Sequence, residues 1–267
     1  MNPPTLPPCY RCHRQPCQCA DGVTLYCADC RELLPHLPAD LATLVLADPP
    51  YSSGGMVRGD RTNKTTRSKY QRTGTLAHYP DFTGDNRDQR GFLAWYSLTL
   101  AACRRVSRPS GFVASFSDWR QLPTVTDAIQ SAGYVWRGIA VWDKTAGVRP
   151  ILGRPSAQCE FIAWGTNGAH KPAGDAIPGL HRQPAPRHRR HQTQKPTQVL
   201  AWLTRLAPQS DAVILDPFAG SGTTGLAAID TGHRAILIEI DPAYCEIAAS
   251  RLMQKSFPSF SPSQPLS

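Results

Sequence analysis

The sequence lacks any run of about eighteen consecutive apolar residues, the length that a membrane-spanning helix needs. Its first residues, MNPPTLPPCYRC, have neither the charged start nor the apolar stretch of a secretory signal peptide. No segment is repeated elsewhere in the chain. We therefore expect a cytoplasmic protein with neither a membrane span nor a leader.

The 267 residues, of which 41% are hydrophobic, can bury one α/β core, or one core with a small insertion. We expect one main domain with additional segments at its ends and in its middle. These segments are a Cys-rich start (1–22), two parts of the main domain (23–144 and 193–255), a Pro-, Gly- and Arg-rich insertion (145–192) and a disordered tail (256–267).

Short apolar runs alternate with amphipathic stretches, which is typical of a mostly parallel sheet covered by helices. The apolar runs predict strands at 23–28, 41–47, 110–117, 134–144 and 157–168, the last two paired as an antiparallel edge. The amphipathic stretches predict helices that begin near 30 and span 91–106, 119–133, 195–207 and 242–252. A strand, a glycine-rich turn, a helix and a second strand follow one another within 211–241.

Basic residues outnumber acidic ones by 29 to 20, and two stretches concentrate them. The stretch 57–72 has six Arg or Lys and one acid, and 181–195 has five Arg or Lys, three His and no acid. Such stretches are either solvated loops or contacts for a polyanion such as nucleic acid.

Four of the nine cysteines lie close together at the start, as Cys9, Cys12, Cys17 and Cys19. A disulfide framework is not expected in the reducing cytosol. The C-x2-C-x4-C-x-C spacing can close a tetrahedral zinc site or leave an unliganded cluster of thiols. Cys27 and Cys30 lie at the end of a strand and are expected to be small buried residues.

The glycine-rich turn DPFAGSGTT carries Gly220 and Gly222, which let the backbone approach a ligand at the start of a helix. It lacks the third glycine of a dinucleotide fingerprint and the GK[ST] of a P-loop. Glu239 ends the next strand, where an acid can hold both hydroxyls of a ribose. Together these residues predict a site for a cofactor that contains a nucleoside.

The tetrapeptide DPPY at 48–51, followed by F-A-G-S-G-T at 218–223, resembles the motifs of DNA amino-methyltransferases that use S-adenosylmethionine. The tetrapeptide precedes the glycine loop, an order that resembles the circularly permuted β class of that family. The resemblance implies an α/β fold with a doubly wound, mostly parallel, seven-stranded Rossmann-like sheet and an antiparallel edge. It covers nearly all of the chain after residue 22.

The same resemblance implies roles for individual residues. Asp48 and the Pro49 carbonyl would accept the N–H groups of the target amine, both prolines would fix the loop, and Tyr51 would stack on a base flipped out of the duplex. KPT at 195–197 resembles motif X, AILIEID motif II and VTLYCAD motif III. The implied cofactor-binding residues are Asp29, Lys195, Thr197, Asp216, Phe218, Gly220, Ser221, Gly222, Thr223 and Glu239.

The resemblance implies site-specific methylation of duplex DNA, at adenine N6 because an Asp begins the tetrapeptide. Cytosine N4, an RNA or protein amide substrate and an inactive zinc-containing DNA-binding protein remain alternatives. The sequence leaves open whether the enzyme is a lone regulator, a phage product or half of a restriction system. A homodimer would suit a palindromic site. The expected phosphate contacts are Arg58, Arg61, Lys64, Arg67, Lys69, Arg187, Arg189 and Arg190.

Overall fold

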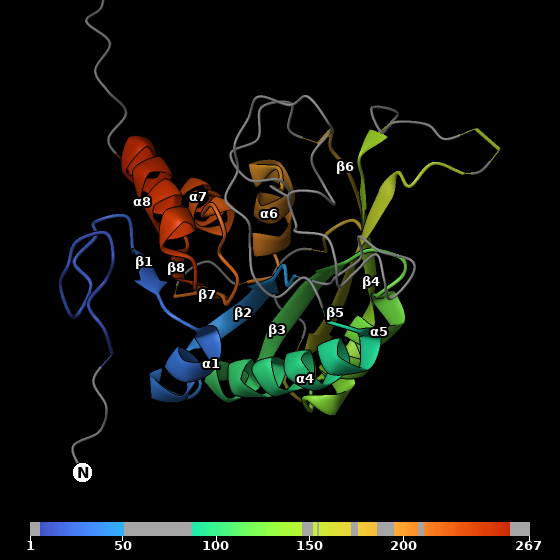
Figure 1. The fold of residues 1–267 in the computed structure, drawn as a ribbon, viewed down its shortest axis with the longest axis horizontal. Coiled ribbons are helices and arrows are strands. Elements are labelled where there is room, and N and C mark those ends of the chain that lie inside the picture. Colours follow the sequence, from blue (N-terminus) through green and yellow to red (C-terminus); the bar gives the residue numbers. More distant parts are fainter. Residues whose placement is uncertain are drawn as a thin grey trace, which may run out of the picture.

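Eight strands form one sheet in the part of the chain that the computed structural model describes, which is 6–50, 87–145, 152–153, 155–171, 176–185, 195–207 and 211–256. Their order is β1-β8-β7-β2-β3-β5-β4-β6 (Figure 1). Their bounds are Val23–Cys27 (β1), Ala42–Ala47 (β2), Ser107–Ser117 (β3), Val135–Asp143 (β4), Cys159–Thr166 (β5), Leu180–Arg182 (β6), Val213–Asp216 (β7) and Arg234–Glu239 (β8).

The first five strands in this order run parallel, and β5 is antiparallel to both β3 and β4. The predicted pairing of the segments 134–144 and 157–168 is therefore confirmed. Strand β6 runs parallel to β4 and lies outside it, so the sheet has one strand more than the seven expected. With three residues, β6 is too short to produce a recognisable pattern in the sequence.

Two further features of the topology were not predicted from the sequence. Strands β1 and β2 follow one another in the chain, but β8 and β7 lie between them in the sheet. Strand β5 belongs to the stretch 145–192 and yet lies between β3 and β4. That stretch therefore contributes an interior strand to the main sheet as well as residues outside it.

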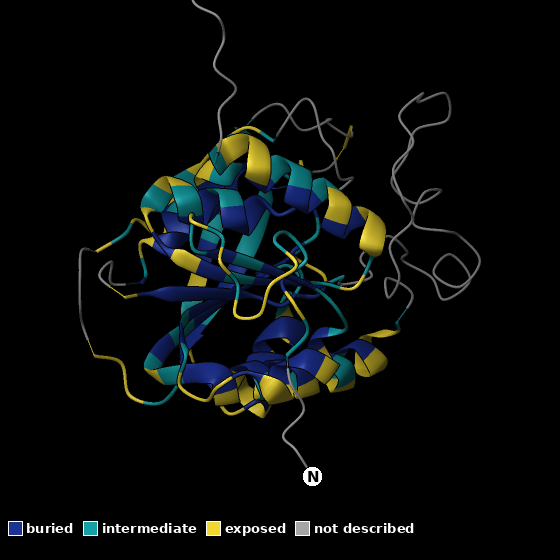
Figure 2. Ribbon diagram, turned by 90° about the vertical axis from the view of Figure 1, so that its left-hand side faces the viewer, coloured by how far each residue is buried: buried dark blue, intermediate teal, exposed yellow. Residues whose placement is uncertain are grey.

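Helices cover both faces of the sheet. In Figure 1, α1, α4 and α5 lie on one face and α6, α7 and α8 on the other, and Figure 2 shows the buried sheet between their exposed outer surfaces. The bounds are Cys30–Leu33 (α1, extended by a 3-10 turn at Leu34–His36), Gln89–Val106 (α4), Leu122–Ser131 (α5), Thr197–Thr204 (α6), Thr223–Thr231 (α7) and Pro242–Ser256 (α8).

The core lies on both sides of the central strands. In β2, Leu44 and Leu46 belong to the core on the face that α6, α7 and α8 cover. Val45 and Ala47 belong to the core on the face that α1, α4 and α5 cover. Successive side chains of a strand point to opposite faces, so a strand that is covered on both sides is apolar at nearly every position. This explains the unbroken apolar run that precedes Asp48.

The neighbouring strands β7 and β2 lead to helices on opposite faces, because α7 covers one face and α4 the other (Figure 1). Ligands of open α/β sheets bind in the crevice outside the carboxyl ends of the strands at such a switch point. The fold thus places a candidate site beyond the ends of β7 and β2.

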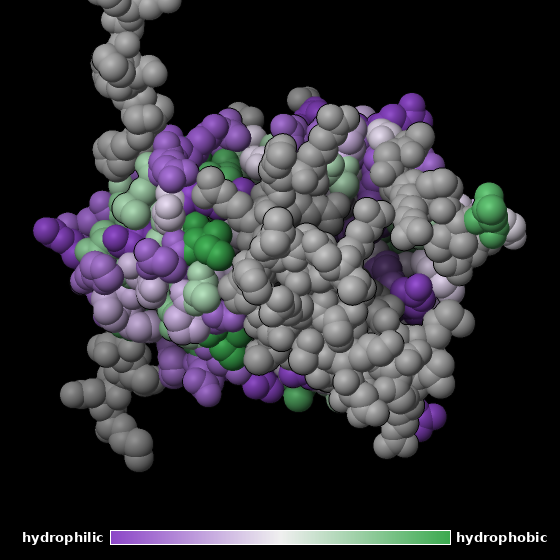
Figure 3. All heavy atoms as spheres, turned by 45° about the horizontal axis from the view of Figure 1, so that its top comes forward, coloured by the Kyte–Doolittle hydropathy of each residue, from purple (hydrophilic) through white to green (hydrophobic). Residues whose placement is uncertain are grey.

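Within the described ranges, no helix is both long and apolar enough to cross a membrane. Figure 3 shows mainly hydrophilic described residues on its left-hand side, with apolar side chains in small separate groups.

Candidate functional site

Four acidic residues lie at the carboxyl ends of four neighbouring parallel strands. Asp29 follows β1, Glu239 ends β8, Asp216 ends β7 and Asp48 follows β2. Cys27 lies opposite Glu239 in the β1–β8 pair, which brings Asp29 and Glu239 to the same edge of the sheet. The sequence separates these acids widely, and the parallel topology brings them to one edge.

Glycines shape the loop between β7 and α7. Gly220 and Gly222 both have positive φ, at 50° and 78°, a backbone region that other residues rarely adopt. The Gly220 N–H donates to Oε2 of Glu239 over 2.7 Å. Arg251 of α8 donates to the carbonyl and the hydroxyl of Ser221 over 2.5 and 2.8 Å, which ties the loop to that helix.

Gly222 also permits close packing of the loop against α8. A Cβ at this position would lie 2.9 Å from the Cβ of Ala248, which is closer than real Cβ contacts. We expect Gly222→Ala to lower the free energy of unfolding by about 2–5 kcal/mol, from about 1–2 kcal/mol for the left-handed backbone and about 1–3 kcal/mol for overpacking. Urea denaturation measures this loss.

The matched control is Gly232→Ala, at the end of α7. Gly232 has a similar φ of 72°, but an added Cβ would meet nothing within 4 Å. This variant should lose only the backbone contribution of about 1–2 kcal/mol. Equal losses in the two variants would contradict a tight contact between Gly222 and Ala248.

Asp216 holds the start of the glycine loop. Its Oδ1 accepts the backbone N–H of Phe218 over 2.9 Å, and its Oδ2 accepts the hydroxyl of Thr224 over 2.5 Å. Burial of the carboxyl group raises the pKa of Asp216 to about 7, although both hydrogen bonds oppose the rise. Asp216 is therefore a buried structural partner of the loop, with its side chain already engaged.

Glu239 is held by two backbone N–H groups. Besides Gly220, the N–H of Asp241 donates to it, to Oε1 over 2.9 Å. Burial raises the pKa of Glu239, and these two N–H groups oppose the rise. Each carboxylate oxygen accepts one of these bonds and keeps a second lone pair, so both can still accept a hydroxyl from a ligand.

Lys195 forms the closest contacts of Asp48. Its ammonium group donates to both carboxylate oxygens of Asp48, over 2.9 and 2.8 Å. The Lys195 side chain is 6% exposed and that of Asp48 is 28% exposed, so the carboxylate faces partly outward while the ammonium group is buried. The sequence pattern predicted a cofactor contact for Lys195, and the structure places it beside Asp48.

Two residues that the sequence analysis missed complete this charged cluster. Glu160 of β5 lies 3.3 Å from the Lys195 ammonium through Oε2, and its Oε1 lies 2.7 Å from the ammonium of Lys144. Glu160 interrupts the apolar run of β5, and an ionisable residue at such a position is rarely buried without a partner. That interruption was the one available signal.

The pKa shifts of the cluster follow from burial and mutual attraction. Burial raises the pKa of Asp48 above the usual range, and Lys195 offsets the rise only in part. Burial alone would lower the pKa of Lys195, but the carboxylates of Asp48 and Glu160 outweigh it and raise this pKa. Burial would raise the pKa of Glu160, yet the two lysines lower it. Lys195 and Glu160 therefore stay ionised at neutral pH.

The other predicted cofactor residues lie around the same edge. Asp29 caps α1 by accepting the backbone N–H of Arg31 over 2.8 Å. Phe218 packs against Trp95 and Tyr96 of α4, with ring centroids 5.5 and 6.2 Å away. Ser221 and Thr223 are buried, and both accept hydrogen bonds from Arg251. Thr197 begins α6.

Several predicted residues lie outside the described part of the chain. They are Tyr51 of the tetrapeptide and the eight basic residues Arg58, Arg61, Lys64, Arg67, Lys69, Arg187, Arg189 and Arg190. Pro49 is buried and Pro50 half-buried, directly after Asp48. The predicted metal ligands Cys9, Cys12, Cys17 and Cys19 converge on one another beside β1.

Comparisons with known proteins match this architecture. The sequence model of the N6_N4_Mtase family, described as DNA methylase, matches residues 42–250. The Type II methyltransferase M2.LlaDCHI of Lactococcus lactis subsp. cremoris is 26% identical over 254 residues, which cover 87% of this chain and 90% of the relative.

Two solved structures share the fold. The M1.HpyAVI–SAM complex superposes with a TM-score of 0.60 at 23% identity, over 86% of this chain and all of that chain (100%). The cytosine-N4-specific PvuII DNA methyltransferase superposes with a TM-score of 0.63 at 17% identity, over 86% of each chain.

Proposed function

The chain belongs to the N6/N4 family of DNA methylases, which use S-adenosylmethionine, and from this premise we propose that it methylates the N6 amine of adenine at a specific site in duplex DNA. One observation carries the proposal. Val45 of β2 lies opposite Leu215 of β7, so the loop that begins at Asp48 and the glycine loop leave neighbouring strands at the switch point of the sheet. A methyl donor and an acceptor amine bound there would meet.

The residues at the carboxyl ends of β7, β8 and β1 fit a nucleoside-containing cofactor. Gly220 bears no side chain, so a ligand can approach the backbone of the loop closely, while Gly222 lets the loop pack against α8. Glu239 has a free lone pair on each oxygen for the two ribose hydroxyls, and Asp29 would reach the adenine ring of the cofactor. When bound, S-adenosylmethionine supplies a methyl group on a positively charged sulfur.

Asp48 and Pro49 would prepare the target nitrogen. The lone pair of an exocyclic amine is delocalised into the base, and acceptors must hold the two N–H groups while the nitrogen becomes tetrahedral. The Asp48 carboxylate and the Pro49 carbonyl can supply these acceptors from a loop that two prolines stiffen. Tyr51 would stack on the base after it has been flipped out of the duplex.

The ion pair with Lys195 bears on this role. The Lys195 ammonium group donates to both oxygens of the Asp48 carboxylate, which fixes the orientation of that carboxylate before substrate arrives. Lys195 also keeps the carboxyl group from taking up a proton as readily as its burial alone would favour. A preorganised, ionised acceptor needs no rearrangement during the reaction.

Two features support the finer assignments. Asp at the first position of the tetrapeptide favours adenine N6 over cytosine N4, although the fold is shared with a cytosine-N4 enzyme. The order of the tetrapeptide before the glycine loop favours the circularly permuted β class. The basic stretches around 57–72 and 181–195 would neutralise phosphates of the duplex.

Mass spectrometry of nucleosides tests the proposal. Unmethylated DNA amplified in vitro is incubated with the protein and S-adenosylmethionine, digested and analysed, with the Asp48→Asn variant in parallel. We expect N6-methyldeoxyadenosine from the unaltered protein alone. N4-methyldeoxycytidine would keep the mechanism and overturn the base assignment. No methylated nucleoside, with the cofactor bound in calorimetry, would overturn DNA as the substrate.

A further inference from the structure

Four cysteine sulfurs converge at the start of the chain. The Sγ atoms of Cys9, Cys12, Cys17 and Cys19 all lie within 4.8 Å of one another, and those of Cys12 and Cys17 are 3.8 Å apart. In a tetrahedral zinc site with Zn–S bonds near 2.3 Å, neighbouring sulfurs are separated by roughly 3.8 Å. A disulfide would require about 2.05 Å. The Cys12–Cys17 distance matches that of a tetrathiolate site, and the other sulfurs lie close enough to join it.

The backbone of this segment forms the turn that such a site needs. The N–H of Cys9 donates to the carbonyl of Arg14 over 3.0 Å, and the N–H of His13 donates to the carbonyl of Cys9 over 2.8 Å. This turn folds the first pair of cysteines back, and the second pair comes from the chain that returns towards β1. Residues 6–22 contain no helix or strand.

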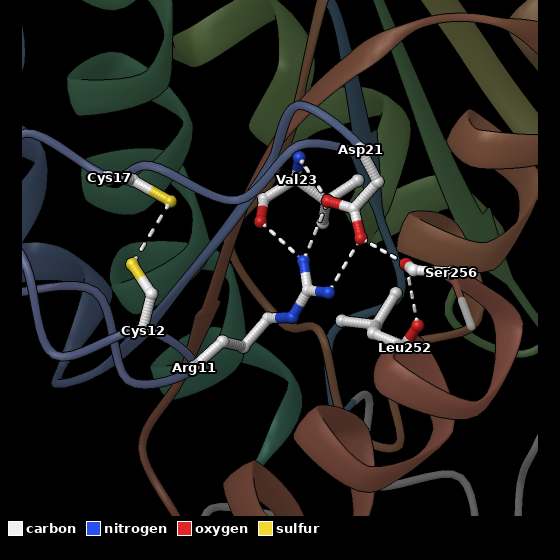
Figure 4. Close-up of polar contacts among 7 residues, drawn as sticks. All are labelled: Arg11, Cys12, Cys17, Asp21, Val23, Leu252 and Ser256. Carbon is white, nitrogen blue, oxygen red and sulfur yellow. Dashed lines mark hydrogen bonds and ion pairs between the residues drawn. The ribbon is translucent and has the colours of Figure 1, made fainter.

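Polar contacts join this segment to the outer edge of the sheet (Figure 4). Arg11 donates to both carboxylate oxygens of Asp21, over 2.8 and 2.6 Å, and to the carbonyl of Val23 over 2.7 Å. Both side chains of this ion pair are under 10% exposed. Asp21 also accepts the hydroxyl of Ser256 at the end of α8, and the N–H of Tyr10 donates to the carbonyl of Leu25 in β1.

We propose that Cys9, Cys12, Cys17 and Cys19 bind one Zn²⁺ in a closed structural site that holds residues 6–22 against β1 and α8. Four thiolates fill the tetrahedral coordination sphere, so no position remains for substrate or water, and the role is structural. The segment has little apolar core of its own, and metal ligation supplies the cross-link that a short irregular segment otherwise lacks. The clamped strand β1 leads to Asp29 and pairs with β8, which carries Glu239.

Metal analysis of the full-length protein, purified without chelator and without a metal-binding tag, tests the proposal first. We expect one equivalent of zinc per chain in the unaltered protein and in Cys27→Ser, a matched control on the neighbouring strand. The double variant Cys12→Ser/Cys17→Ser should retain less than one tenth of an equivalent. A folded protein without zinc, or zinc retained by the double variant, would overturn the proposal.

A second measurement does not depend on whether the variants fold. Cobalt(II) exchanged into the unaltered protein should give the visible absorption of a tetrahedral ion together with thiolate-to-metal charge-transfer bands. Removal of zinc by a chelator should lower Tm, and added Zn²⁺, but not Mg²⁺, should restore it. An octahedral cobalt spectrum, or an unchanged Tm after zinc has been removed, would contradict the site. None of these measurements requires methyl transfer, so the outcome is independent of the proposed function.

Discussion

In the Asp48→Asn variant, methyl transfer should fall by at least about 100-fold while the affinity for S-adenosylmethionine stays nearly unchanged. Asparagine has the same shape, but one of its two terminal groups is an N–H donor. Lys195 donates to both carboxylate oxygens of Asp48, so the amide oxygen of the variant will turn towards the ammonium group. The amide nitrogen takes the place of the other carboxylate oxygen, so the variant has one acceptor fewer for the N–H groups of the target amine.

The variant should remain folded, which separates this prediction from a general loss of structure. Lys195 keeps Glu160 as a partner 3.3 Å away, so its buried charge is not left alone. Calorimetry measures cofactor binding, and tritium transfer from labelled cofactor measures the reaction. The matched control is Asp211→Asn, an exposed residue that precedes β7 and pairs with Arg108 at 2.8 Å. Transfer within tenfold of normal in Asp48→Asn would refute the role of this carboxylate.

Local sequence predicted the elements of the site because each one has a local cause. The four residues before Asp48 are all apolar since both faces of the strand are covered, and the positive φ at Gly220 and Gly222 demands glycine. The closing of α5 by Gly133, whose φ is 88°, follows from the same preference. Patterns of this kind extend over a few residues and can be read without knowledge of the fold.

The charged cluster around Asp48 depends on register, which no short stretch of sequence specifies. Glu160 reaches Lys195 because β5 pairs with β4 so that Glu160 lies opposite Trp142. A slip of one residue would turn the Glu160 side chain to the opposite face of the sheet. The apolar run of β5 predicts a strand, and its pairing with β4 was expected, but the register of that pair was not fixed, so Glu160 and Lys144 could not be assigned from sequence.

The same limit applies to the order of strands. The segments that became β1 and β2 were correctly predicted as strands on either side of a short helix. The insertion of β8 and β7 between them is decided by residues some 170 positions later in the chain. Only after that insertion do Asp29, Glu239, Asp216 and Asp48 form one row along the edge of the sheet.

Replacement of Lys195 by Met should lower the free energy of unfolding by about 3–5 kcal/mol at neutral pH, because it leaves the carboxylates of Asp48 and Glu160 without the buried cation that they share. Lys195 is 6% exposed and contacts both Asp48 and Glu160. Glu160 retains Lys144 at 2.7 Å, so the uncompensated charge falls mainly on Asp48. The control Lys255→Met removes a surface pair with Asp230 and should cost no more than about 1 kcal/mol.

The dependence of Lys195→Met on pH provides a sharper test. Without the ammonium group, the pKa of Asp48, which burial already raises, must rise further. A carboxyl group whose pKa is higher in the folded than in the unfolded protein binds more protons when folded, so the variant loses stability as the pH rises above the unfolded value of about 3.9. Transfer requires the ionised carboxylate, so the rate of the folded variant should rise over the same pH range.

The stability of Lys195→Met should therefore fall as the pH rises, while its rate of methyl transfer increases. Removal of the Glu160 carboxylate should restore part of the lost stability. In the double variant Lys195→Met/Glu160→Gln, no repulsion between Glu160 and Asp48 remains, so the pKa of Asp48 falls back and part of the stability returns. Urea denaturation measures the stability and single-turnover kinetics measure the rate. Both are followed between about pH 5 and 8, where most proteins are stable. If Lys195→Met loses no more stability than Lys255→Met, or if its rate and stability follow the pH dependence of the unaltered protein, Lys195 does not govern the charge of Asp48.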